Sequence, residues 1–171
     1  EEEIFACVEN NQRLQTEHKV TEEDTGVELV KTQRRIAAGK TLGAIGLGEK
    51  PAPRGYAIQL RINMETMGSD GEALPSGGTL TAYQAPSGPG VRGDGFGYAG
   101  YTTSPHDDSL LAKLIVTSSN ADYLYTVKRA ERALSEFKIE GVKTNIAFHR
   151  NLLASEAFLA NNVYTTYIAD N

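Results

Sequence analysis

The stretch LLAKLIVT, residues 110–117, gives the clearest indication of the fold of this 171-residue chain. Its side chains are almost all aliphatic, and the polar stretch SPHDDS (104–109) comes directly before it. A short apolar run bounded by turn-forming residues is typical of a buried β-strand. We therefore predict a strand over 110–117 and a loop that leads into it.

Two helices are predicted after this strand. Over residues 121–137, apolar side chains recur at steps of four and three, the stripe of a helix that lies on a sheet. The members of this stripe are Tyr123, Val127, Ala130, Leu134 and Phe137. The second helix begins near Thr144 and continues through Leu153.

The segments before residue 110 predict further strands. YAIQLRINME (56–65) alternates, with Ile58, Leu60 and Ile62 on one side and polar residues such as Arg61 on the other. GTLTAY (78–83) is a plausible partner strand, and 84–108 is rich in glycine and proline. Strands that come first and helices that come later, without regular alternation, indicate an α+β fold with a mainly antiparallel sheet and packed helices.

The first third of the chain has a different character. IFACV (4–8) predicts a short buried strand, and a helix is expected over 26–38. Thr25 and Glu28 have the spacing of a capping box, and Gly39 stands where a helix C-terminus favours a left-handed residue. Residues 41–54, punctuated by Gly and Pro, are expected to be a linker between a first unit (1–40) and a second one (55–165).

Composition excludes several classes of partner. A net charge of −5 argues against a nucleic-acid partner, which requires a basic surface. No apolar run reaches the roughly 20 residues of a membrane helix, so no membrane partner is expected. A single cysteine, Cys7, and an acidic N-terminus without a basic signal region predict a reduced, cytoplasmic location, with the mitochondrial matrix left open.

Two motifs are interpreted as structural. GPGVRG (88–93) satisfies the dinucleotide fingerprint, but it neither follows a buried strand nor opens a helix, so we interpret its glycines as turns. His106, Asp107 and Asp108 are adjacent, and neighbours in an extended segment point to opposite sides, so a loop is favoured over a metal site.

The stretch ENNQRLQTEH (9–18) carries the strongest chemical pattern, because polar side chains occupy every second position. If it is extended, these side chains share one face: Glu9, Asn11, Arg13, Gln15 and Glu17. The first two offer hard oxygen ligands of the kind Mg²⁺ prefers, and an arginine fork suits a small oxyanion. An amide can donate a hydrogen to that anion, and a nearby carboxylate can take a proton from it.

The same alternation has a purely structural interpretation. An exposed edge strand is often rich in charge, because charge prevents association with other strands. The Glu–Arg–Glu order also matches a surface ladder of ion pairs, which contributes little to stability. Periodicity alone leaves both interpretations open.

A resemblance favours the chemical interpretation. Residues 9–18 resemble the E-x-N-x-R-x-Q-x-E-H segment of biotin carboxylases, the ATP-grasp component of biotin-dependent carboxylases. Later blocks resemble the same family in the same order: RGYAIQLRIN, LPSGGTL, PSGPGVR, GYAGYTTSPHDDSLLAKLIV and IEGVKTNIAF. The sequences PSGPGVR and SPHDDSLLAKLIV are most similar to those of enzymes of the acyl-CoA, pyruvate or urea carboxylase type. The resemblance covers nearly the whole chain.

The resemblance assigns roles position by position. It makes Glu9 a ligand of Mg²⁺ (or Mn²⁺) bound to ATP, with Asn11 beside it. Arg13, Gln15 and the backbone at Thr16 would hold bicarbonate. Glu17 would deprotonate bicarbonate for attack on the γ-phosphate of ATP. Arg61 would face the ureido oxygen of biotin, which is presented as a substrate on a carrier domain.

The resemblance also implies a larger assembly. The chain would be the end of an ATP-grasp domain (1–40), followed by the biotin carboxylase C-terminal domain (55–165). Its partners would be a biotin carboxyl carrier domain and a carboxyltransferase domain or subunit, which selects the final acceptor. A homo-oligomer is expected, although Pro89 replaces a residue of the dimer interface found in some members.

Departures from the family pattern limit what the chain is expected to do alone. Three features of the family would lie upstream of Glu9: a glycine-rich lid, an ATP-binding lysine and a first metal-binding glutamate. We therefore expect the isolated chain to be inactive. Lys19 also replaces the residue that usually follows E-H. A non-catalytic scaffolding or interaction module that kept the fold is the alternative.

Overall fold

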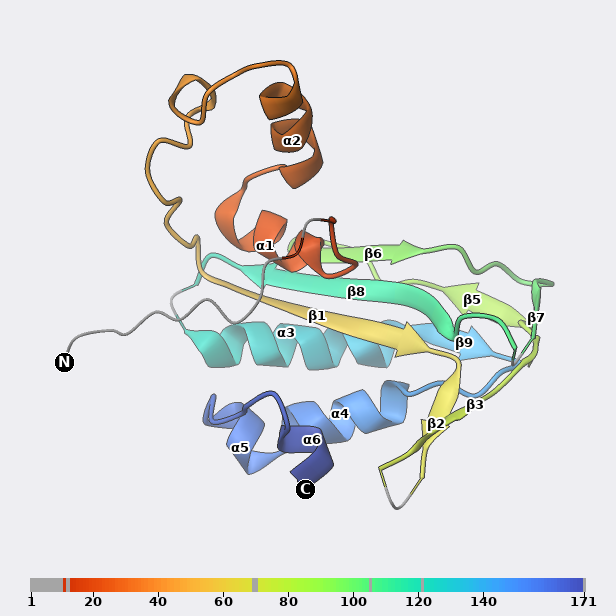
Figure 1. The fold of residues 1–171 in the computed structure, drawn as a ribbon. Coiled ribbons are helices and arrows are strands. Elements are labelled where there is room, and N and C mark those ends of the chain that lie inside the picture. Colours follow the sequence, from red (N-terminus) through yellow and green to blue (C-terminus); the bar gives the residue numbers. More distant parts are fainter. Residues whose placement is uncertain (1–10, 12, 69–70, 105, 121, 171) are drawn as a thin grey trace.

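A three-stranded antiparallel sheet, in the order β1-β8-β6, forms the centre of the computed structural model (Figure 1). The structure describes residues 11, 13–68, 71–104, 106–120 and 122–170. The predicted strand 4–8, Cys7 and Glu9 therefore lie outside the described residues.

The central strand is β8 (Leu110–Ser118), and this confirms the strand predicted from LLAKLIVT. It pairs on one side with β1 (Tyr56–Asn63) and on the other with β6 (Val91–Gly95), both antiparallel. Ile62 is paired with Ala112, whereas Asn63 is paired with Leu110, so the register shifts at a β-bulge. Such a bulge re-aims the residues beside it.

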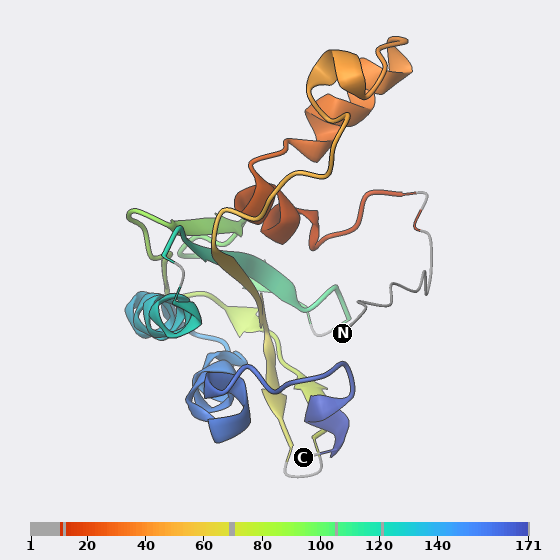
Figure 2. The same ribbon diagram turned by 90° about the vertical axis from the view of Figure 1, so that its left-hand side faces the viewer.

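The two faces of the sheet differ in chemistry. Successive side chains of a strand point to opposite faces, so Leu60 and Ile62 of β1 lie on the side that packs against α3 (Tyr123–Glu136). Arg61, between them, is exposed on the other side. Helix α1 (His18–Thr25) lies over that polar face, so α1 and α3 are on opposite sides of the sheet (Figure 2).

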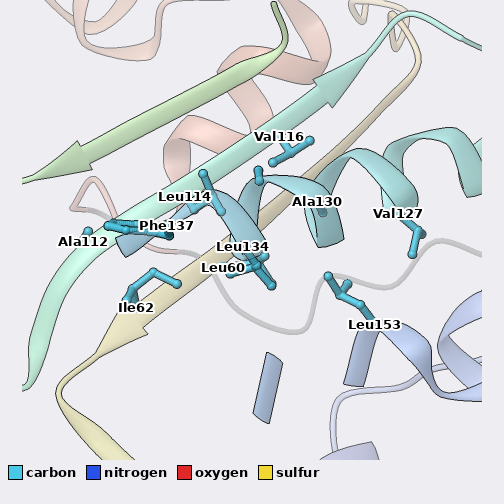
Figure 3. Close-up of a cluster of buried hydrophobic side chains, with 11 residues drawn as sticks. Leu60, Ile62, Ala112, Leu114, Val116, Val127, Ala130, Leu134, Phe137 and Leu153 are labelled. Carbon is cyan, nitrogen blue, oxygen red and sulfur yellow. The ribbon is translucent and has the colours of Figure 1, made fainter. Parts of the chain in front are cut away.

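The hydrophobic core lies between the sheet and α3. In Figure 3 the α3 side chains Val127, Ala130 and Leu134 meet the apolar face of β1 and β8. This confirms the predicted helix and its stripe, and Asp122 starts the helix, because its carboxylate accepts a hydrogen bond from the Leu124 amide at 2.9 Å. Leu153 of α4 (Ile146–Ala154) completes the cluster and confirms the second helix.

The remaining elements are short. Three two-stranded pairs extend the structure beyond the central sheet: β2 (Glu65–Met67) with β3 (Ala73–Pro75), β4 (Gly78–Thr79) with β7 (Thr102–Thr103), and β5 (Ala82–Gln84) with β9 (Lys138–Glu140). The short helices are η1 (Gly43–Ile45), α5 (Glu156–Leu159) and α6 (Tyr167–Asp170). Together the strands and helices confirm the α+β class.

The predicted strand 78–83 is broken into β4 and β5. At the break, the Leu80 amide donates to the Tyr101 carbonyl, and the Thr81 amide donates to the Glu140 carbonyl. Adjacent residues therefore bond to different parts of the chain, which ends one ladder and begins another. GPGVRG has no helix after it: residues from Val91 onward enter β6, in agreement with the interpretation as turns.

The predicted helix 26–38 is shorter, because a separate helix precedes it. Helix α2 runs over Leu29–Ala37, and Gly39 is left-handed with a φ of 82°, as expected. The capping-box prediction is wrong: Thr25 belongs to α1, and its hydroxyl donates to the Thr21 carbonyl. The Leu29 amide instead donates to the carboxylate of Glu22.

Candidate functional site

The candidate site lies on the face of the central sheet that carries Arg61, opposite α3. Arg61 of β1 and Lys113 of β8 are directly opposite in the antiparallel register. Directly opposite residues place their Cβ atoms about 4.5–5.5 Å apart, and like charges at that separation repel. Two cations held side by side create a position where an anion binds favourably.

Lys113 joins this face to the stretch that follows residue 10. Its Nζ donates a hydrogen bond to the backbone carbonyl of Thr16 at 3.2 Å. The structure therefore brings the predicted bicarbonate-binding segment and the predicted biotin-facing Arg61 to the same lysine. Lys113 was not among the site residues predicted from the sequence, although a lone charge inside an aliphatic strand is a usable signal.

The prediction of an extended ribbon is wrong for residues 13–17. The chain bends at Arg13 and turns at Thr16 and Glu17, and Glu17 has helical dihedral angles (φ −85°, ψ −1°) at the start of α1. The Gln15 carbonyl accepts bonds from the His18 amide at 3.3 Å and from the His18 Nδ1 at 2.6 Å. These local bonds close a turn, which removes the strict alternation of faces.

The predicted substrate-binding side chains lie at the surface. Arg13, Gln15, Thr16 and Glu17 are all exposed, as is Arg61. Of the two predicted metal ligands, Glu9 lies outside the described residues and Asn11 is exposed. Among the residues that the structure describes, no three His, Cys, Asp or Glu side chains cluster closely enough to hold a metal ion.

An ion-pair network fixes α1 on the sheet directly after this segment. Lys19 pairs with Asp94 at 3.0 Å, and Arg92 pairs with Asp94 at 3.0 Å and with Glu23 at 3.2 Å. Asp94 is also the β6 partner of Lys113 in the register. The network thus connects α1 to β6 beside the two cations of the site.

The charges in this network shift the pKa values of their members. Burial alone raises the pKa of Asp94, but the hydrogen bonds and positive charges of Arg92 and Lys19 outweigh it and lower this pKa below its ordinary value of 3.8. The hydrogen bond from Arg92 to Asp94 is the largest cause of the raised pKa of Arg92. Both groups therefore stay charged at neutral pH.

A cavity of about 650 Å³ lies near the site without including it. It lies between α1 and the beginning of β1, where its lining includes Val20, Asp24, Tyr56 and Ala57. Its described lining contains none of the predicted site residues. A substrate held by Arg61 would therefore lie farther along β1, outside this cavity.

The adjacent residues His106, Asp107 and Asp108 lie in a loop, as the sequence predicted. All three are exposed, and the loop comes before β8. The Asp108 carboxylate accepts a hydrogen bond from the Leu110 amide at 2.9 Å, so it caps the entry to the strand. Throughout the described ranges, none of the helices combines the length and the apolar character needed to cross a bilayer.

Comparison with known proteins supplies the family. Residues 59–170 match the family described as "Biotin carboxylase C-terminal domain", and residues 1–45 match "Carbamoyl-phosphate synthase L chain, ATP binding domain". Pyruvate carboxylase of Schizosaccharomyces pombe is 45% identical over 165 residues, which are 95% of this chain and 14% of that protein. The chain therefore spans a small part of this relative.

Solved structures agree with this assignment. A single-chain, multi-domain long-chain acyl-CoA carboxylase superposes with a TM-score of 0.86 at 46% identity, over 94% of this chain and 18% of that one. The biotin carboxylase domain of 2-oxoglutarate carboxylase from Hydrogenobacter thermophilus, a dimer in complex with MgADP and bicarbonate, has a TM-score of 0.80 at 38% identity, over 94% of this chain and 34% of that one. By the extent of the first match and by these likenesses, the chain belongs to the biotin carboxylase C-terminal domain family, as its sequence motifs predicted.

Proposed function

We propose that this chain forms the bicarbonate and biotin side of a biotin carboxylase site within a longer biotin-dependent carboxylase. The observation that carries the proposal is the position of Lys113, which bonds to the Thr16 carbonyl and lies opposite Arg61. The two groups that would handle bicarbonate and biotin are thereby connected through one side chain, although 97 residues separate Lys113 from Thr16.

The segment that follows residue 10 would handle bicarbonate. Arg13 provides a planar fork for the anion, with Gln15 and the Thr16 backbone as further contacts. Glu17 would take the proton of bicarbonate, since bicarbonate is a poor nucleophile until it is deprotonated. The exposure of these side chains leaves them accessible to a substrate. Attack of the resulting carbonate oxygen on the γ-phosphate of ATP would then release ADP.

Arg61 would act on the second substrate, biotin. Loss of the proton from the ureido nitrogen of biotin, before that nitrogen attacks CO2, develops negative charge on the ureido oxygen, and an arginine fork stabilises such a charge where it forms. The neighbouring charge of Lys113 adds to the positive potential at this position. A β-bulge next to Ile62 supports the proposal further, because bulges often occur beside active sites.

The other substrates and cofactors would be held jointly with the rest of the enzyme. ATP and its Mg²⁺ or Mn²⁺ would be bound by the ATP-grasp domain, of which residues 1–40 would be the end, with Glu9 and Asn11 as metal ligands. Residues 41–54 would be the linker and 55–165 the C-terminal domain. A biotin carboxyl carrier domain and a carboxyltransferase would be its partners in a homo-oligomer of the cytoplasm or the mitochondrial matrix.

The test is a pair of variants in an enzyme that contains this chain together with a complete ATP-binding domain. E17Q should abolish bicarbonate-dependent ATP cleavage, and R61M should lower biotin carboxylation while ATP cleavage without biotin continues. The surface pair Arg132 and Glu136 on α3 supplies the matched controls R132M and E136Q. Unchanged biotin-dependent ATP cleavage in both site variants would favour the scaffolding alternative.

The chain alone is a second test. We expect the isolated 171-residue chain to show no ATP cleavage that depends on biotin and bicarbonate, because a site with part of its ligands binds substrate poorly. Measurable turnover by the isolated chain would contradict the proposed division of labour between this chain and the ATP-binding domain.

A further inference from the structure

The outer edge of β1 is held by side chains rather than by another strand. In the central sheet β1 has β8 on one side and, among the described residues, no strand on the other. The free edge of a strand presents unpaired N–H and C=O groups, which must find other partners when they are shielded from water. At Arg61 and Asn63 those partners come from the beginning of α4.

Asn145 pairs with this edge as a strand residue would. Its side-chain Oδ1 accepts a hydrogen bond from the backbone N–H of Asn63 at 3.0 Å. Its backbone N–H donates to the backbone carbonyl of Asn63 at 3.2 Å. Its Nδ2 then donates to the Arg61 carbonyl at 3.1 Å. Since Oδ1 must face an N–H donor, the orientation of the amide is fixed. Asn145 is only 5% exposed, so these bonds are protected from solvent.

His149 adds a second donor to the same carbonyl. It lies one helical turn after Asn145, and its Nε2 is 2.9 Å from the Arg61 carbonyl oxygen. A carbonyl can only accept, so Nε2 carries the hydrogen of the neutral ring. Nδ1 is buried and has no hydrogen-bond partner among the described residues. Among the described residues, the hydrogen bond of this ring therefore goes to the backbone of Arg61.

The carboxylate of Glu65, the first residue of β2, fixes this arrangement just beyond the end of β1. Glu65 Oε1 accepts from Asn63 Nδ2 at 2.9 Å and from Asn145 Nδ2 at 3.3 Å. Its Oε2 accepts from the Ser109 hydroxyl at 3.2 Å. The side-chain amide of Asn145 is thus bonded to β1 and to Glu65. Through Glu65 and Ser109, the start of α4, the end of β1 and the residue before β8 are joined.

We propose that Asn145 and His149 are positioning residues for Arg61. This inference rests on the proposed function, in which the Arg61 guanidinium faces biotin. The two side chains hold the carbonyl of Arg61 from the strand edge, while its guanidinium extends from the polar face. The position of the backbone and the direction in which the side chain leaves it set the region that the guanidinium of Arg61 can reach. A backbone held in place therefore limits that region. Displacement of a catalytic group by about 1 Å can cost up to ~100-fold in rate.

The test compares variants of His149 in the full-length enzyme. H149L removes the donor and should lower kcat/KM for biotin by roughly 10- to 100-fold. ATP cleavage that depends on bicarbonate in the absence of biotin should stay within about twofold of the wild type, because Arg61 takes no part in that step. H149Q keeps an N–H donor at a similar reach and should recover most of the lost activity.

Two further variants separate positioning from folding. N145S, which is too short to reach the Arg61 carbonyl, should show the same selective loss as H149L. R150Q is the matched control, because Arg150 is next to His149 on α4 but pairs with Glu131 of α3 at 2.8 Å and not with β1. We expect R150Q to retain both activities.

Each outcome has a defined meaning. A selective loss for biotin in H149L, with recovery in H149Q, supports the positioning role. Wild-type kinetics in H149L, or an equal loss of both activities in H149L and N145S, would overturn it. If R61M leaves biotin carboxylation unchanged, the proposed function itself fails. A loss in R61M without any in H149L rejects only the positioning role.

Discussion

Arg61 and Lys113 lie directly opposite each other on adjacent antiparallel strands, with both cations on the polar face of the sheet. This pairing costs stability unless nearby acceptors compensate for it. The Thr16 carbonyl is one such acceptor, since it bonds to the Lys113 ammonium at 3.2 Å. The pair therefore serves as the point at which two segments distant in the sequence are brought into one site.

Replacement of Lys113 should impair the function of this site. K113M keeps most of the apolar part of the side chain but removes the bond to the Thr16 carbonyl and one positive charge. We expect kcat/KM for bicarbonate in the complete enzyme to fall by about tenfold or more, because the segment proposed to bind the anion loses its bond to β8. K138M is the control, since Lys138 pairs with Glu140 at 3.3 Å on the exposed strand β9, away from the candidate site. Equal kinetics for the two variants would contradict this role of Lys113.

The network around Asp94 should contribute to stability in a way that depends on pH. D94N removes the charge that Lys19 and Arg92 share, and we expect a loss of about 1 kcal/mol at pH 7, since the pairs are partly exposed. The pKa of Asp94 is lowered in the folded state, so its contribution is present above the ordinary value of 3.8 and is lost as the pH falls through the folded pKa.

Urea unfolding of the wild type and D94N at pH 7 and at pH 3 measures this difference. The two free energies of unfolding should differ most at pH 7, and the difference should be smaller at the lower pH. High salt should also reduce the difference, because it screens exposed ion pairs. A difference that is the same at both pH values would exclude the charge as its source.

His149 should make the stability of the chain fall in mild acid. Burial lowers its pKa below the ordinary value of 6.5, against the smaller raising effects of the bond to the Arg61 carbonyl and the charge of Glu65. The unfolded chain then binds a proton at a pH where the folded chain does not. Stability therefore rises with pH in this window and falls as the pH drops below about 6.5.

The variant H149Q removes this titration and keeps a hydrogen-bond donor. Its free energy of unfolding relative to the wild type should change between pH 8 and pH 5, with the wild type losing more stability on acidification. H106Q is the control, because His106 is exposed in the loop before β8. Parallel curves for the wild type and H149Q would show that burial of the ring has no energetic consequence.

Truncation of a core side chain should lower the free energy of unfolding most at the centre of the sheet. Leu114 of β8 is 0% exposed and belongs to the cluster formed with α3, so L114A leaves a cavity. We expect a loss of about 3 kcal/mol in the free energy of unfolding. L74A is the control, because Leu74 is 54% exposed and should change stability by less than about 0.5 kcal/mol. Chemical denaturation measures both.

The sequence alone determined the parts of this protein that depend on local pattern. The strand over 56–63 and the helix over 123–136 follow from the periodicity of their apolar residues, and the strand over 110–118 follows from its continuous apolar run, which is buried on both faces. The family likewise followed from motifs that lie in order along the chain. Both signals are carried by neighbouring residues, so no tertiary contact is needed to recognise them.

Only the tertiary structure decided how these parts meet. The alternation in residues 9–17 favoured an extended ribbon, but a turn closed by His18 and the helix after it replaced the ribbon from Arg13 onward. The meeting of Thr16 with Lys113 spans 97 residues, and that of Arg61 with Asn145 spans 84. The partners of these backbone groups come from elements far away in the sequence. The periodicity of neighbouring residues therefore cannot predict which distant donor an unpaired backbone carbonyl will bond to.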